Sequence, residues 1–302
     1  MRVFLTGATG FIGSRILPEL LAAGHQVVGL TRSDAGAAAL AAAGAEVHRG
    51  TLEDPSSLRA GAEKADAVIH TAFDHDFSNF VSNCEKDRRV IEAMGDALKG
   101  SDRPLIITSG TGIGAPAPGE LAVEDMFNPS HANPRIVSEV TGNALRDAGI
   151  DVRVMRLPQV HDTERQGLIS PYVMIAREKG VVAYVGDGAN RWPAAHVSDV
   201  ARLYVLALDQ GRPGARYNAV AEEGITARAI AEVVAAGLGL PAVSLSPGEA
   251  EAHFGWFGMF AAMDMPASSA LTRERLGWQP VGPGLIADLE QMDYGLAAAV
   301  SS

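Results

Sequence analysis

Apolar and polar positions in the first half of the chain follow an alternating strand and helix rhythm. Strand-like apolar runs occupy residues 1–6, 26–30, 45–50, 66–73, 104–110 and 151–157. Segments with helical spacing lie between them, and two of these end at Gly24 and Gly44, as helices commonly do. The runs are nearly continuous in Val, Ile and Leu, which indicates strands buried on both faces. The pattern predicts an α/β fold with a doubly wound parallel sheet.

The rhythm changes beyond about residue 158, where loops lengthen and Gly and Pro become frequent. Helical patterns then dominate, at 225–240, 270–278 and 285–292. We therefore expect a first unit over residues 1–158 that carries the sheet. The second unit, over 159–302, is expected to be a smaller, mainly helical lobe at the carboxyl edge of that sheet.

Composition narrows the class of protein. Of the 302 residues, 47% are hydrophobic and 20% charged, which is typical of a globular chain with a sizeable core. The formal net charge of −11 disfavours nucleic acid and anionic membranes, so we expect a small-molecule substrate, with homodimer formation left open. No apolar run has membrane-spanning length and the chain enters a strand pattern at once, which favours a cytoplasmic protein. The single cysteine, Cys84, is expected to be a packed thiol.

A glycine motif follows the first predicted strand. In FLTGATGFIGSRIL, residues 4–17, Gly7, Gly10 and Gly13 stand between a strand and a helix. Gly7 permits a tight turn, Gly10 lets the backbone approach a pyrophosphate, and Gly13 allows close packing of the helix on the strand. The N-terminus of the helix would face the negative charge. This context favours a dinucleotide-binding loop over an ordinary glycine-rich turn.

The end of the second predicted strand bears on the choice of cofactor. Sheets that bind NAD usually carry an acidic residue there, which holds the ribose hydroxyls. This chain instead has Arg32 at that place, in GLTRSD, and an arginine fork suits the 2′-phosphate of NADP. Asp34 lies close by and weakens the argument. We predict that NADP(H) is preferred and that NAD(H) is a possible alternative.

Several motifs, taken together, indicate a family. They are TGATGFIG, RGTLEDPSSL, DAVIHTAF, LIITSGTGIG, RLPQVHD, GDGANRWPAAHVSDVARLYVLAL and LGWQP. In this order they resemble the extended short-chain dehydrogenase/reductase superfamily over nearly the whole chain, most closely its NAD-dependent epimerase/dehydratase or 3β-hydroxysteroid-dehydrogenase-like branch. The resemblance implies a Rossmann-type sheet in an NADP-binding unit. It also implies that part of 181–223 returns to complete that unit, beside a substrate-binding lobe.

The resemblance implies a cofactor site at positions matched one by one. The pyrophosphate would be wrapped by Thr6, Gly7, Thr9, Gly10, Phe11, Ile12 and Gly13. Thr51 and Leu52 stand where relatives have an Asp-Leu pair beside the adenine, so the acid is missing here. Thr71, Ala72 and Phe73 would line the nicotinamide-ribose side, and Leu157 and Pro158 would back the nicotinamide ring. His196 and Asp199 have family counterparts too, but we favour a structural role for both, with Asp199 capping a helix.

The family's catalytic set is incomplete in this chain. The resemblance places Ser109 at the family's serine, with Thr111 as a nearby substitute. The family's Tyr and Lys are absent: taking Glu139 as a marker, Arg135 falls at the lysine position and His131 at the tyrosine position. Arg135 stays cationic and can hold ribose hydroxyls. His131 is an alternative proton donor, although Asn133-Pro134 resembles a helix start, which would leave His131 in the preceding loop.

Other proton donors remain open. His75 follows the nicotinamide-side segment, and the flanking Asp74 and Asp76 are expected to raise its pKa. His161 and Tyr172 are further candidates, although ordinary structural roles are the simpler interpretation of both. Two acids and one histidine in a row lack a ligand geometry set by secondary structure, so we expect no metal site.

Three functions fit these residues. The leading hypothesis is an NADPH-dependent reductase of a C=O, C=N or C=C bond in a small apolar substrate. A sugar-nucleotide epimerase or dehydratase is an alternative, but such relatives keep the Tyr/Lys pair. A non-catalytic NADP(H) sensor is another. Residues 253–265, HFGWFGMFAAMDM, could line an apolar pocket over the nicotinamide, although packing onto their own lobe is the simpler interpretation.

Overall fold

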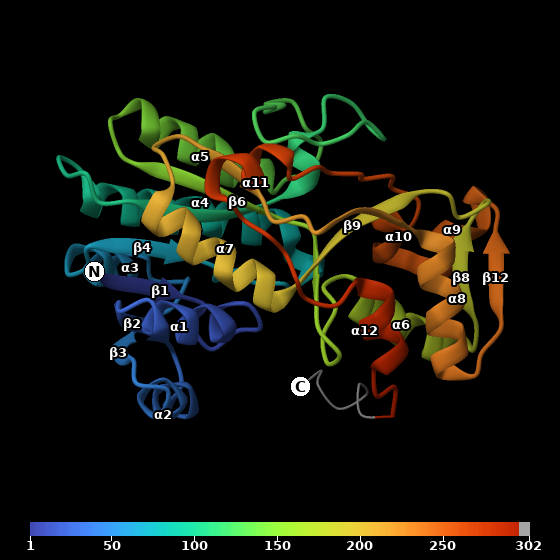
Figure 1. The fold of residues 1–302 in the computed structure, drawn as a ribbon. Coiled ribbons are helices and arrows are strands. Elements are labelled where there is room, and N and C mark those ends of the chain that lie inside the picture. Colours follow the sequence, from blue (N-terminus) through green and yellow to red (C-terminus); the bar gives the residue numbers. More distant parts are fainter. Residues whose placement is uncertain (296–302) are drawn as a thin grey trace.

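The structure, a computed structural model, describes residues 1–295, and a seven-stranded sheet dominates this part of the chain (Figure 1). In spatial order the strands are β10 (Arg216–Asn218), β6 (Val152–Leu157), β5 (Leu105–Gly110), β4 (Ala67–His70), β1 (Arg2–Thr6), β2 (Gln26–Thr31) and β3 (Glu46–Arg49). Every neighbouring pair is parallel. The parallel sheet predicted from the apolar runs is therefore confirmed.

Helices cover both faces of this sheet (Figure 1). One face carries α1 (Gly13–Ala22), α2 (Asp34–Ala42) and α7 (Val197–Gln210), and the other carries α3 (Pro55–Glu63), α4 (Phe80–Leu98) and α5 (Ile136–Asp147). Alternate residues of β1 serve the two cores. Val3 and Leu5 pack with the first set of helices and Phe4 with the second. The carboxyl ends of β1, β4 and β5 consequently meet at one edge, where sheets of this kind bind ligands.

A second apolar core lies beside that edge (Figure 1). Its helices are α6 (Ile169–Lys179), α8 (Ala227–Leu238), α9 (Pro247–Phe254), α10 (Gly258–Ala261) and α12 (Leu285–Gln291). Two small sheets accompany them, one of β11 (Glu222–Thr226), β9 (Arg191–His196) and β7 (Gln159–His161), the other of β12 (Ala242–Leu245) and β8 (Val182–Val185). This lobe is mainly helical, as predicted, but its short strands were not apparent in the sequence.

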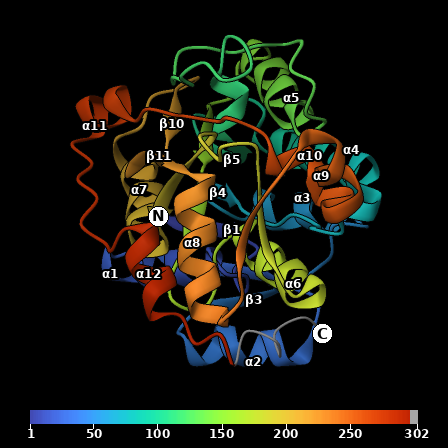
Figure 2. The ribbon, with the colours of Figure 1, turned by 90° about the vertical axis from the view of Figure 1, so that its right-hand side faces the viewer.

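The chain crosses between the two cores more than once. The strand β10 joins the edge of the large sheet beside β6, after the excursion that builds part of the second core. Later, α11 (Ala270–Leu276) returns to lie near β10, before α12 goes back to the second core (Figures 1 and 2). No helix within residues 1–295 is both long and apolar enough to cross a membrane.

Two predicted boundaries differ from the structure. The run 66–73 is a strand only as far as His70, so Thr71, Ala72 and Phe73 begin the loop that follows. The helix expected at Asn133-Pro134 begins at Ile136. Asn133 does not cap it: its Oδ1 accepts a hydrogen bond from the backbone N of Arg135 at 2.9 Å and closes a turn before the helix.

Candidate functional site

The glycine motif forms a close turn between β1 and α1. Gly7 has a φ of +68°, and a Cβ there would lie 2.7 Å from Thr71 Oγ1. A Cβ at Gly13 would overlap the carbonyl oxygen of Gly7, so the start of α1 also requires glycine. Gly10 N donates to that same carbonyl oxygen at 2.8 Å. The loop therefore has the compact backbone that a pyrophosphate site requires at a helix N-terminus.

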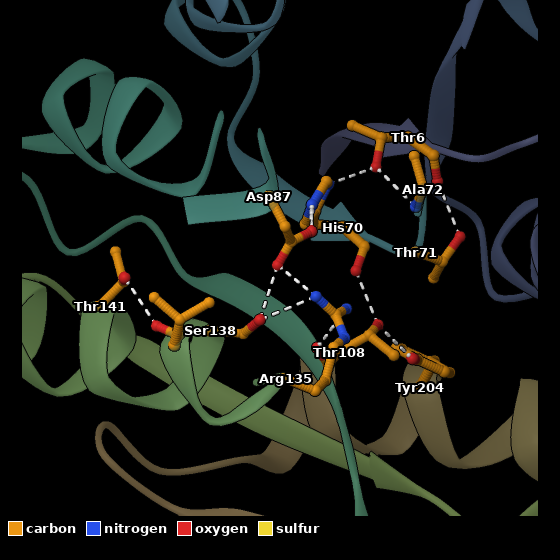
Figure 3. Close-up of polar contacts among 11 residues, drawn as sticks. Thr6, His70, Thr71, Ala72, Asp87, Thr108, Arg135, Ser138, Thr141 and Tyr204 are labelled. Carbon is orange, nitrogen blue, oxygen red and sulfur yellow. Dashed lines mark hydrogen bonds and ion pairs between the residues drawn. The ribbon is translucent and has the colours of Figure 1, made fainter. Parts of the chain in front are cut away.

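The loop after β4 is bonded to this turn through Thr6. Thr71 Oγ1 donates to the carbonyl oxygen of Thr6 at 2.8 Å, and Ala72 N donates to Thr6 Oγ1 at 3.3 Å (Figure 3). The segment assigned to the pyrophosphate and the segment assigned to the nicotinamide ribose are thus side by side. The structure brings together Thr6, Thr71 and Ala72, three of the residues expected to bind the cofactor.

Arg32, directly after β2, is exposed and has no hydrogen-bond or ion-pair partner among the described residues. The nearby acid, Asp34, is instead paired with Arg49 at the end of β3, with Arg49 Nη2 2.5 Å from Asp34 Oδ1. Asp34 therefore does not neutralise Arg32, and the guanidinium remains available to an anionic ligand.

Thr51 and Leu52, the segment expected beside the adenine, follow β3 and belong to a polar bridge. The Thr51 hydroxyl donates to Glu53, and Lys86 Nζ contacts Glu53 at 2.9 Å and Asp74 at 2.8 Å. The hydrogen bonds from Thr51 and Lys86 lower the pKa of Glu53 to about 2. Lys86 on α4 thus ties the loop after β3 to the loop after β4.

Ser109 and Thr111, the candidate hydroxyls, are buried at the end of β5 and in the 3₁₀ turn Thr111–Gly114. Ser109 Oγ has no partner with hydrogen-bond geometry among the described residues, although it lies near the Glu139 carboxylate. Burial tends to raise the pKa of Glu139, but Arg156 and Arg216 together outweigh it and lower the pKa, with a smaller contribution from Ser109. The Ser109 hydroxyl is thus directed toward α5.

Arg135 is held from several sides at the edge of the sheet (Figure 3). Its Nη1 lies 2.5 Å from Asp87 Oδ2 and donates to Ser138 Oγ at 2.8 Å, and its Nη2 donates to the carbonyl oxygen of Thr108 at 3.0 Å. The guanidinium carbon lies 3.9 Å from the centre of the Phe73 ring, a cation–π contact. Only 12% of the Arg135 side chain is exposed.

Asp87 is the acidic centre of this network. Its side chain is 1% exposed, and Oδ1 accepts a hydrogen bond from His70 Nε2 at 3.0 Å. Because a carboxylate only accepts, His70 carries its proton on Nε2, and Nδ1 accepts from the Thr6 hydroxyl at 2.7 Å. Burial alone would raise the pKa of Asp87, but Arg135 and His70 outweigh it and hold the pKa at about 2.

His131 lies in the loop before α5, one turn outside the helix. Its Nδ1 accepts a hydrogen bond from the backbone N of Asn133 at 3.1 Å, so the neutral ring carries its proton on Nε2. Partial burial lowers the pKa of His131, against a smaller opposite effect of Glu139. His131 therefore keeps one free ring nitrogen.

His75 does not behave as its sequence neighbours suggested. Asp74 and Asp76 were expected to raise its pKa, but the pKa of His75 is lowered. The largest cause is the loss of hydration that the surrounding groups impose on the charged ring, and the positive charge of Arg135 is the next. Asp74 acts weakly in the opposite direction. Because His75 keeps an exposed surface, the loss of hydration has a limited effect on its pKa. The prediction of a raised pKa is nevertheless wrong in direction.

The remaining candidates have structural roles. Tyr172 donates its hydroxyl to the carbonyl oxygen of Ala183 at 2.8 Å, and buried His161 is hydrogen bonded to Asp288 at 2.6 Å. The N-cap of α7 is His196, whose Nδ1 accepts from Ser198 N, and not Asp199 as predicted. Asp199 lies in the first turn and accepts hydrogen bonds from the backbone N of 281 and 282.

An aromatic ladder, formed by Phe73, His75, Phe77 and Trp256, leads away from Arg135. Successive ring centres are 5.2, 6.3 and 4.9 Å apart, and the Phe77 and Trp256 rings are nearly parallel at 11°. Trp256 is 46% exposed, whereas the neighbouring phenylalanines of 253–265 are buried in the second core. That segment therefore packs mainly onto its own lobe, as the simpler interpretation held, while Trp256 reaches the loop after β4.

Sequence reasoning missed Asp87 and His70, which lie at the centre of the network. A signal for Asp87 was present: Cys84, Asp87, Val90, Ile91 and Met94 share one buried stripe of α4. A charged residue on an otherwise apolar helix face requires a partner, because an unpaired buried charge is costly. Cys84 itself is buried, and burial raises its thiol pKa to about 11, so the packed thiol is confirmed. Leu157 and Pro158 lie half-buried at the carboxyl end of β6.

Comparison with known proteins agrees with this geometry. Residues 3–219 match the NAD dependent epimerase/dehydratase family. The chain belongs to this family. It is thereby a member of the extended short-chain dehydrogenase/reductase superfamily, whose members are NAD(P)-dependent oxidoreductases, epimerases and dehydratases.

Individual relatives differ in what is known of them. An uncharacterized protein of Schizosaccharomyces pombe is 46% identical over 295 residues, 97% of this chain and 100% of the relative. Vestitone reductase of Medicago sativa is 26% identical over 72% of this chain and 76% of its own length. A solved structure of the UDP-glucose 4-epimerase of Thermus thermophilus with NAD has a TM-score of 0.73 at 22% identity, covering 99% of this chain and all of the other. This last likeness shows the Rossmann-type fold.

Proposed function

We propose that this protein is an NADPH-dependent reductase of a C=O, C=N or C=C bond in a small apolar organic substrate. The observation that carries the proposal is Arg32, an exposed guanidinium at the end of β2 whose neighbouring acid is paired with Arg49. An unpaired arginine at this point suits the 2′-phosphate that distinguishes NADP from NAD.

The described residues fit such a cofactor. The glycine turn has no room for a Cβ at Gly7 or Gly13, and its backbone would hold the pyrophosphate. Arg135 would hold the nicotinamide-side ribose, with Thr71, Ala72 and Phe73 beside it and Leu157 and Pro158 behind the ring. The bound cofactor would supply a hydride to the substrate.

The substrate side is apolar and lacks the family's tyrosine. The aromatic ladder offers ring faces and edges next to Arg135, which favours an apolar or planar substrate over a sugar. His131, with a free Nε2, is our first proton donor, and His75 is the second. Ser109 would orient the substrate oxygen only after its hydroxyl turns away from Glu139.

Among the relatives, vestitone reductase supports a reductase, since its name describes a reduction. The likeness to UDP-glucose 4-epimerase supports the competing epimerase hypothesis at the level of fold. The absent tyrosine and lysine weigh against an epimerase of the usual mechanism.

The first experiment measures binding of NADPH and NADH to the wild type and to Arg32→Ala. We expect Arg32→Ala to weaken NADPH about tenfold or more, because a charged hydrogen-bonding partner of the 2′-phosphate is lost, and to leave NADH unchanged. The matched control is Arg59→Ala, which removes an exposed arginine of α3 that is paired with Glu63. NADPH oxidation is then followed with a panel of aldehydes, ketones and imines.

Each outcome selects one function. Preference for NADPH that depends on Arg32, with turnover of a panel member, supports the reductase. Tight NADPH binding with no turnover of any member favours a cofactor sensor. A preference for NADH that Arg32→Ala does not alter contradicts the proposal and favours the epimerase.

A further inference from the structure

We propose that Asp87 is a positioning residue for the cofactor, because it fixes the orientation of the Arg135 guanidinium. The inference rests on the proposed function, in which Arg135 holds the nicotinamide-side ribose. It adds a residue of α4 to a site otherwise built from the loops after β1, β2, β4 and β5.

The carboxylate of Asp87 is fully engaged. Oδ1 accepts from His70, and Oδ2 accepts from both Arg135 and Ser138, the latter at 2.7 Å (Figure 3). Since the side chain is 1% exposed, water does not compete for these positions. The arrangement is specific for a carboxylate, which alone accepts at both oxygens from three donors.

The contacts of Arg135 leave part of its guanidinium free. Asp87 and Ser138 occupy Nη1, and the Thr108 carbonyl takes one N–H of Nη2. The N–H of Nε and the second N–H of Nη2 have no partner among residues 1–295. Stacking on Phe73 restricts the plane in which they lie. A long, flexible side chain thereby presents two donors in one orientation, as hydroxyls of a ribose require.

The ion pair also changes the electrostatics of the site. In the family's usual arrangement a lysine lowers the pKa of the catalytic tyrosine by its unbalanced positive charge. Here a carboxylate 2.5 Å from the guanidinium offsets part of that charge, although Arg135 still contributes to the lowered pKa of His75. The chain has no tyrosine at the family's position on which such a charge could act. The two departures are consistent with a cation whose main role is to bind the cofactor.

The same network reaches the glycine turn. His70 connects Asp87 to the Thr6 hydroxyl, and Thr6 directly precedes Gly7. Thr108 closes the network from β5: its hydroxyl donates to the His70 carbonyl oxygen at 2.6 Å and lies 2.7 Å from the Tyr204 hydroxyl (Figure 3). Asp87 therefore joins the group that would hold the ribose to the strand that leads into the pyrophosphate loop.

The test compares two ligands on the full chain by calorimetry, NADPH and adenosine 2′,5′-bisphosphate. The bisphosphate keeps the adenine end and lacks the nicotinamide ribose. Asp87→Asn is expected to weaken NADPH about tenfold, the effect of losing one well-oriented charged contact, and to change bisphosphate binding less than twofold. The matched control is Asp96→Asn, an acid of the same helix that is paired with Lys99 at the surface and should alter neither affinity.

A double-mutant cycle tests whether Asp87 acts through Arg135. In an Arg135→Ala background, Asp87→Asn should produce no further loss of NADPH affinity. Asp87→Glu is expected to restore part of the affinity that Asp87→Asn loses. Should Asp87→Asn fail to fold, Ser138→Ala removes a contact shared by both charged groups and is expected to weaken NADPH about threefold, again sparing the bisphosphate.

The inference is overturned if Asp87→Asn or Ser138→Ala leaves NADPH affinity unchanged, weakens both ligands equally, or adds its full effect in the absence of Arg135. These results are distinct from failure of the proposed function. If the proposed function fails, the wild type itself binds NADPH no more tightly than the bisphosphate, or it prefers NADH.

Discussion

In the His131 ring, Nδ1 is hydrogen bonded within the loop, and Nε2 has no hydrogen-bond partner among the described residues. Nδ1 accepts from Asn133 N, and partial burial lowers the ring's pKa, so the neutral form dominates at pH 7. A neutral imidazole is a weak acid, and protonation of Nδ1 would require loss of the Asn133 contact. If His131 donates the proton, the rate must therefore depend on the small protonated fraction.

This predicts a reaction that becomes faster as the pH falls. NADPH oxidation with a substrate from the panel, corrected for its spontaneous decay, should rise between pH 8 and pH 6, where the protonated imidazole becomes more abundant. His131→Gln should lower kcat about 100-fold and remove this pH dependence, with NADPH affinity unchanged. The comparison variant is His75→Gln. A large loss of kcat in that variant, with none in His131→Gln, would transfer the role of donor to His75.

At the scale of elements, the loop before α5 is held by a buried arginine of β6. Arg156 is fully buried, binds Glu139 of α5 through two 2.8 Å contacts, and donates to the carbonyl oxygens of Val123 and Met126 at 3.1 and 2.8 Å. A buried side chain that donates hydrogen bonds to the carbonyl oxygens of a loop restricts that loop to one conformation. The segment that carries His131 and Arg135 is thus fixed to β6 at one end by Arg156 and to α4 at the other by Asp87.

The aromatic ladder joins two elements that are remote in sequence, the 3₁₀ turn Phe77–Asn79 and the turn Gly255–Phe257. We predict that Trp256→Ala raises the KM for 2-naphthaldehyde about tenfold through loss of a stacking surface, and changes the KM for propanal less than twofold. Val281→Ala, which truncates another exposed apolar side chain, is the control. An equal rise for both aldehydes would show that Trp256 supports the fold of the lobe and not substrate binding.

At the scale of the whole molecule, a buried pair ties together two segments of the second lobe that lie 127 residues apart in sequence. His161 of β7 is fully buried and bonds to Asp288 of α12, so the last described helix is tied to the strand that continues from β6. Burial is the largest influence on His161 and lowers its pKa, although Asp288 acts in the opposite direction. The folded protein therefore binds a proton at this site less readily than the unfolded chain does.

The sign of the resulting pH dependence follows from linkage. Above the unfolded pKa of about 6.5, His161 is neutral in both states and the full stability is present. As the pH falls below that value, the unfolded chain takes up the proton first and stability is lost. We expect the free energy of unfolding in urea to fall by about 1 kcal/mol between pH 7 and pH 5.5, and His161→Gln to reduce this loss. His253→Gln, which alters a less buried ring, should retain most of it. An identical loss in wild type and His161→Gln would contradict the assignment.

The sequence by itself determined the parallel sheet, the glycine turn and the position of Arg32 after β2. Each depends on local rules: unbroken runs of Val, Ile and Leu require burial on both faces, and Gly7 and Gly13 occupy positions where a Cβ would collide with nearby backbone or side-chain atoms. Arg32 follows a strand whose end is predictable from the same pattern.

Only the tertiary structure decided the chemistry around these elements. Asp87 and Arg135 are 48 residues apart, and their pairing depends on α4 and α5 packing side by side on one face of the sheet. The direction of the pKa change at His75 likewise depends first on the groups that displace water around the ring, and then on Arg135, which lies far along the chain and outweighs the adjacent acid. Electrostatic effects follow distance and burial in space, and neither is encoded by the spacing of residues along one strand or helix.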